Sequence, residues 1–203
     1  MLGDSYILDL TIGEEKKELY FNYQTLKNLY KLTQQNPFYY LQDFMLSKNR
    51  DEFLGTIIYC MANGNIELED INIILEDVNV KNYLLLGIIN IITIEFKSEY
   101  EEEENDSKKD DNEQVEKTEE EKLKEFENYW NSCYFTATVK LKKTEEEFYK
   151  MSPRELKTLD KYNSNYYKNI LIDTYVTVLN AKNGKVGDEK EEVVTIARFK
   201  DIC

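Results

Sequence analysis

The hydrophobic pattern of the first residues predicts a β-hairpin that leads into a helix. Tyr6, Leu8 and Leu10 alternate with the residues between them, which is the period of two typical of a strand. A polar run around Gly13 separates this stretch from the segment 18–23, so we expect a hairpin with its loop near Gly13. From Tyr23 onwards the apolar residues are spaced by three and four, which predicts a helix.

The helical spacing continues to about residue 98. We expect Pro37 to end the first helix, because proline interrupts helical hydrogen bonding. Four more helices are predicted at about 38–46, 50–62, 68–77 and 81–98. The stretch 83–96, YLLLGIINIITIEF, is apolar on nearly all sides and too short to span a bilayer. It therefore predicts a buried helix, covered either by its own domain or by a partner.

Composition changes abruptly after Phe96. Residues 99–127 contain 15 acidic and 5 basic side chains, a net charge of −10 out of −14 for the whole chain. Such a stretch has too little apolar surface to offset the entropy lost on ordering. We therefore predict an acidic disordered linker at 98–127, whose ends can be helical because Glu and Lys favour helices. It would join a hairpin-plus-helical domain at 1–97 to a small helical domain at 128–203.

The second segment contains two helix-start signals. Thr144 followed by Glu147 fits a capping box, and Ser152 followed by Pro153 and Glu155 fits a second one. A helix running through residues 129–130 precedes them. A longer helix from Asn165 to about Leu179 follows, and the segment after about 183 alternates weakly, as in an extended tail or an edge strand. The predicted fold class is mainly α with a small N-terminal β-hairpin.

Several kinds of chemistry are disfavoured by the composition. The chain has no histidine, which is the commonest general base and metal ligand, and no phosphate-binding or nucleophile motif. The carboxylates of Asp70, Glu76 and Asp77 are better explained by a solvated helix face than by a cation site. We expect no enzymatic activity, no cofactor and no metal. A net charge of −14 also disfavours binding to nucleic acid or to an anionic membrane.

The residue types that remain point to protein binding. Trp130, the only tryptophan, is either a core anchor or a partner-facing hot spot. The pair Phe148–Tyr149 either joins the two short helices or contacts a client. The acidic linker is either a passive tether or an electrostatic lure that keeps a client dispersed. Three distant cysteines and an N-terminus without an export-signal pattern predict a reducing cytoplasm.

Part of the second segment has a family resemblance. The pair Tyr129-Trp130, followed by EEEFYKMSPRELKTLDKY at 145–162, resembles the signature of phage tail assembly chaperones, and the first segment is similar to their first domain. The resemblance implies that the first domain binds the tape measure protein and keeps it soluble, while the second recruits tail tube subunits. It also implies that several copies line one client in the bacterial host cytoplasm. The expected partner-binding residues are Tyr129, Trp130, Phe148, Tyr149, Pro153 and Leu156.

An alternative remains open on the same sequence. An acidic adaptor or nucleic-acid mimic that occupies a basic partner would also be acidic and non-enzymatic. It would need its carboxylates spread over a folded surface, whereas here they are concentrated in one segment. A position beside a very long tape-measure-like reading frame favours the chaperone, and tight salt-sensitive binding to a basic nuclease favours the mimic.

Overall fold

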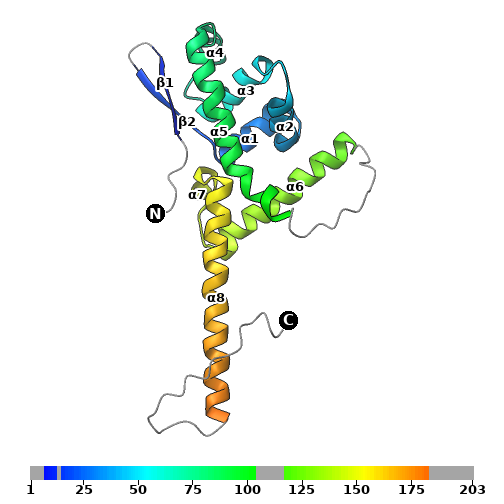
Figure 1. The fold of residues 1–203 in the computed structure, drawn as a ribbon, viewed down its shortest axis with the longest axis vertical. Coiled ribbons are helices and arrows are strands. Elements are labelled where there is room, and N and C mark those ends of the chain that lie inside the picture. The colour runs from blue at the N-terminus through cyan, green and yellow to red at the C-terminus, as the bar shows by residue number, and fades with distance from the viewer. Residues whose placement is uncertain (1–6, 13–14, 104–116, 183–203) are drawn as a thin grey trace. The chain divides into compact units, whose positions relative to one another are not determined.

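A computed structural model describes residues 7–12, 15–103 and 117–182 of the chain. The chain divides into two compact units, Met1–Lys161 and Tyr162–Cys203, which we call unit 1 and unit 2. The described part is mainly helical and opens with one two-stranded sheet, as predicted (Figure 1). Its elements are β1 (Ile7–Ile12), β2 (Glu15–Tyr20), α1 (Tyr23–Thr33), α2 (Pro37–Leu46), α3 (Asp51–Ala62), α4 (Leu68–Ile74), α5 (Val78–Glu103), α6 (Glu119–Phe135), the π-helix η1 (Thr136–Lys140), α7 (Glu145–Lys150) and α8 (Pro153–Lys182).

The predicted hairpin is confirmed, and it lies close against α5. Strands β1 and β2 pair antiparallel, with Ile7 opposite Tyr20 and Leu10 opposite Lys17. A Cβ placed on Gly87 of α5 would lie 2.6 Å from a terminal carbon of Leu8. This separation is shorter than van der Waals contact, so a larger residue at position 87 would force the Leu8 side chain to move.

The five predicted helices of the first segment are present, with one correction at Pro37. Helix α1 already ends at Thr33, and Gln34 follows in the left-handed region at φ 57°. Pro37 instead begins α2, where its missing N–H would have no helical partner. The side chain of Asn36 caps this helix by accepting from the Phe38 N–H (2.9 Å).

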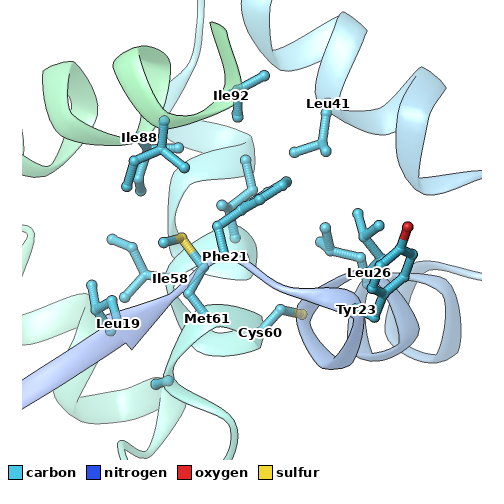
Figure 2. Close-up of a cluster of buried hydrophobic side chains, with 14 of the residues drawn as sticks. Leu19, Phe21, Tyr23, Leu26, Leu41, Ile58, Cys60, Met61, Ile88 and Ile92 are labelled. Carbon is cyan, nitrogen blue, oxygen red and sulfur yellow. The ribbon is translucent and has the colours of Figure 1, made fainter. Parts of the chain in front are cut away.

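The core of unit 1 is built around Phe21, which follows β2 directly. Figure 2 shows its ring among side chains from several helices, with Leu41 from α2, Met61 from α3 and Ile88 from α5 nearby. These side chains are at most 2% exposed, so this cluster supplies much of the hydrophobic stabilisation.

The apolar helix α5 is buried on one face only, so the predicted full burial is corrected. Leu84, Ile88 and Ile91 face the core, whereas Tyr83 and Leu86 are 53% and 67% exposed. Among the described residues, Val78–Phe96 is one stretch long and apolar enough to cross a membrane by length and composition, and 28% of it is buried. This is weak evidence for a span, because the core helix of a soluble protein can pass the same test.

Two details of the second segment follow from its capping residues. Thr144 and Glu147 form the predicted capping box, in which each side chain accepts from the other residue's backbone N–H (3.2 and 2.8 Å). The Ser152 hydroxyl accepts from the Glu155 N–H (3.2 Å). Helix α8 starts there, at Pro153, and continues without interruption to Lys182, so the start predicted at Asn165 is wrong.

The predicted division into domains at 1–97 and 128–203 is also not the division found in the structure. Helices α6 and α7 lie inside unit 1, where α6 contacts α2 and α7 contacts α1. The Tyr23 N–H donates to the Met151 carbonyl (3.0 Å), and the Asn36 side-chain amide donates to the Lys122 carbonyl (2.7 Å). The end of the proposed linker belongs to α6. Residues 104–116 and the proposed tail after 182 lie outside the described residues.

Candidate functional site

The six residues predicted to bind partners all lie in unit 1, on α6, α7 and the start of α8. Phe148 of α7 is fully buried and stacks on the Tyr23 ring, with 4.4 Å between centroids. Trp130 of α6 packs edge-on against both rings, at 5.3 Å from Phe148 and 5.9 Å from Tyr23. We call Tyr23, Phe126, Trp130, Phe148 and Tyr149 the aromatic junction, because it joins α6 and α7 to α1.

Burial decides which of the predicted residues can meet a partner. Three of them, Phe148, Pro153 and Leu156, are buried in the folded chain and so cannot contact a partner. The partner-binding role expected for these three residues is therefore corrected to a core role. Tyr129 is half-buried, and its hydroxyl lies 3.3 Å from that of Tyr23, within hydrogen-bonding distance. Trp130 and Tyr149 are half-buried and retain exposed surface.

An apolar groove opens beside the aromatic junction. Its volume is about 400 Å³, within the range of ligand-binding pockets. The groove is lined by Lys27, Tyr30, Lys31, Phe126, Glu127, Trp130 and Asn131. We call it the Trp130 groove. Sequence reasoning identified Trp130 but not the rest of the lining, since α1 and α6 are far apart along the chain.

A second, more polar pocket of about 180 Å³ lies between α5 and the start of α8. Glu95 is 4% exposed there, and its carboxylate accepts from the Arg154 N–H (2.9 Å) at the N-terminus of α8. Burial raises the pKa of Glu95, while the bonds from Arg154 and Ser152 lower it, and the effect of burial is the larger. Burial also raises the pKa of Tyr23 well above its usual value. Glu95 therefore caps α8 from another helix.

This cap predicts a specific dependence of stability on pH. Because the pKa of Glu95 is raised on folding, the folded protein retains a proton that the unfolded chain has lost, so this group's contribution falls as pH rises through the folded pKa. The melting temperature of the wild type, minus that of Glu95→Gln, should therefore increase when the pH falls from about 7 to about 5. A difference that is constant over this range would contradict the assignment.

The described part of unit 2 is the continuation of α8, and it exposes many large apolar side chains. They are Tyr162, Tyr166, Tyr167, Ile170, Leu171, Tyr175, Val178 and Leu179, each between 37% and 70% exposed. They occupy most sides of the helix and alternate with polar residues. We call residues 162–179 the apolar half of α8. The sequence predicted a helix from Asn165 to about Leu179, but it did not predict that the apolar side chains of this helix are exposed.

Little in the described structure favours catalysis. Among the described residues, no group of three or more acidic, cysteine or histidine side chains is placed to hold a metal ion. Burial raises the pKa of Cys60 to about 12, so its thiol stays protonated at neutral pH and is a poor nucleophile. The prediction that the protein is not an enzyme stays a prediction.

The chain was compared with known proteins at three levels. No protein-family model, no curated protein and no solved structure matched it. The resemblance to phage tail assembly chaperones therefore stays a prediction from the sequence.

Proposed function

We propose that the protein is a non-enzymatic chaperone of the phage tail assembly type, which holds the tape measure protein in solution and recruits tail tube subunits. The observation that carries this proposal is the apolar half of α8. Eight large apolar side chains are exposed along residues 162–179, and a contiguous exposed apolar surface marks a site of interaction with another molecule. A client with its own apolar stripe would cover this surface by helix-to-helix packing.

The distribution of charge supports the same proposal. Residues 162–203 contain six basic and six acidic side chains, so the net charge of −14 belongs entirely to unit 1. Within residues 162–179 the charged side chains are Lys168 and Asp173, one of each sign. A neutral apolar segment can bind a client while the acidic unit keeps the complex soluble. The tape measure and tube proteins enter as partners through the resemblance at 145–162.

The test is co-expression with a phage tape measure protein, read out as the soluble fraction of that client. Ile170→Glu combined with Leu171→Glu should reduce the soluble client several-fold, because two charges replace apolar contacts that the complex would bury. The variant should fold normally, since both positions are exposed. Asn169→Glu is the matched control, because it adds charge at an exposed polar position of the same helix.

The possible outcomes distinguish the role of α8 from the chaperone function itself. Full retention of soluble client by the double variant would contradict the role of α8, provided that the wild type keeps the client soluble. A wild type that fails to keep the client soluble would contradict the chaperone function itself. Equal loss with Asn169→Glu would show that charge, and not the removal of apolar surface, is responsible.

A further inference from the structure

The Trp130 groove combines an aromatic floor with a positively charged rim. The rings of Tyr30 and Phe126 are 5.2 Å apart, and those of Phe126 and Trp130 are 5.8 Å apart, so three aromatic side chains from α1 and α6 form a continuous surface. Phe126 is buried beneath, whereas Tyr30 and Trp130 are half-buried. Such a floor favours a large apolar side chain, and Trp and Tyr are enriched among residues that dominate binding energies.

The rim carries two lysines on one face of α1. Lys27 and Lys31 are four residues apart, a spacing at which like charges on a helix repel each other. The Lys27 ammonium is held in place, because it donates to the Tyr149 hydroxyl (2.6 Å) and lies 3.9 Å from the centre of that ring. Lys31 is exposed and makes no ion pair with any residue that the structure describes. Glu127 is the one acidic side chain in the lining.

This local charge is opposite to that of the unit around it. Unit 1 carries the whole net charge of −14, yet the groove presents two ammonium groups against one carboxylate. Two cations beside an apolar floor are complementary to a ligand that carries both a large apolar group and a negative charge. Two lysines are too few for a nucleic-acid backbone, which is bound by many phosphate contacts.

We propose that the Trp130 groove binds an acidic peptide segment of a partner protein, in which one large apolar side chain lies within a helical turn of an Asp or Glu. The apolar side chain would rest on Tyr30 and Trp130, and the carboxylate would lie near Lys31. The groove shares no residue with the apolar half of α8. The proposal is therefore independent of the chaperone function, and either can fail without the other.

Another possible occupant is the acidic segment of this chain itself. Residues 104–116, ENDSKKDDNEQVE, contain Val115 as their single aliphatic residue and no aromatic one. The segment lacks the large side chain that the aromatic floor favours. We therefore commit to a partner's peptide, and the test below includes the alternative.

The experiment uses the full chain and the fluorescence of Trp130, which is its only tryptophan. The probe is a synthetic acetylated and amidated peptide of about ten residues, with one phenylalanine flanked by glutamates. A second peptide carries glutamine in place of each glutamate. The acidic peptide should shift the Trp130 emission in a saturable manner and bind about fivefold more tightly than the glutamine peptide at low salt. Added salt should remove this preference.

Variants test where the peptide binds. Lys31→Glu should weaken binding of the acidic peptide about tenfold, because attraction becomes repulsion, and should leave the glutamine peptide nearly unaffected. Lys48→Glu is the matched control, since Lys48 is an exposed lysine outside the groove and the same charge change there should have little effect. Circular dichroism of each variant verifies that the fold is retained.

Three results would overturn the proposal. The first is equal affinity for the two peptides at low salt, and the second is an equal loss of binding in Lys31→Glu and Lys48→Glu. The third is binding that is seen only after deletion of residues 104–116, which would assign the groove to this chain's own acidic segment. Saturable binding with the expected preference, lost in Lys31→Glu alone, would support it.

Discussion

Phe148→Ala is expected to lower the free energy of unfolding of unit 1 by about 3–5 kcal/mol, the usual cost of removing a buried phenylalanine. The ring is 0% exposed and contacts Tyr23, Trp130 and Tyr134, with centroid distances of 4.4, 5.3 and 5.3 Å. Its removal leaves a cavity at the junction that joins α6 and α7 to α1. Chemical denaturation followed by far-UV circular dichroism would measure the effect.

The control for this substitution is Phe135→Ala. Phe135 lies at the end of α6 and is 53% exposed, so its truncation should cost much less, about 1 kcal/mol or below. The comparison distinguishes a core role of Phe148 from the partner-binding role expected from the sequence. If Phe148→Ala had the same free energy of unfolding as the wild type, the core role of Phe148 would be contradicted. A partner-binding role would then be favoured.

A chain that ends at residue 116 is expected to lose cooperative unfolding, whereas one that ends at residue 161 should retain it. The shorter chain lacks α6 and α7, and therefore the rings that cover Tyr23 and Phe38. Each buried aromatic or aliphatic side chain contributes about 1.5–3 kcal/mol, so the loss of several is comparable to the roughly 5–15 kcal/mol that stabilises a whole domain. Thermal melts of both chains would measure this.

The longer chain serves as the control, because it keeps all of unit 1 and removes only unit 2. It should also aggregate less than the full chain, since it lacks the apolar half of α8. If the chain ending at 116 melted cooperatively at the wild-type temperature, residues 1–97 would be an independent domain. The division predicted from the sequence would then be the correct one.

Local patterns were sufficient to predict most elements of this fold. The period of two at residues 6–11 and the helical spacing after Tyr23 depend only on which side chains face the same way, and the structure confirms the elements they predict. The capping box at Thr144 is equally local, because both of its hydrogen bonds join residues three apart. The separate helix start predicted at Asn165 is wrong because the Asn and Ser residues before it only weakly disfavour a helix, so α8 continues through them.

The packing of the elements could not be predicted in the same way. An apolar stripe on residues 119–135 indicates that α6 covers something, but not whether its partner is α1, α2 or its own segment. The same limit applies to the Trp130 groove, in which Lys27 is held by Tyr149, 122 residues away along the chain. Single-sequence patterns carry no information on contacts of that separation.

Because the net negative charge is confined to unit 1, copies of the protein that bind one client should repel one another through this unit. If several copies bind one long client through α8, their anionic units are tethered side by side and repel one another, which sets a minimum spacing between them. The repulsion decays over the Debye length, about 8 Å at physiological ionic strength. The spacing between bound copies would then depend on ionic strength. Copies would bind closer together in concentrated salt and farther apart in dilute buffer.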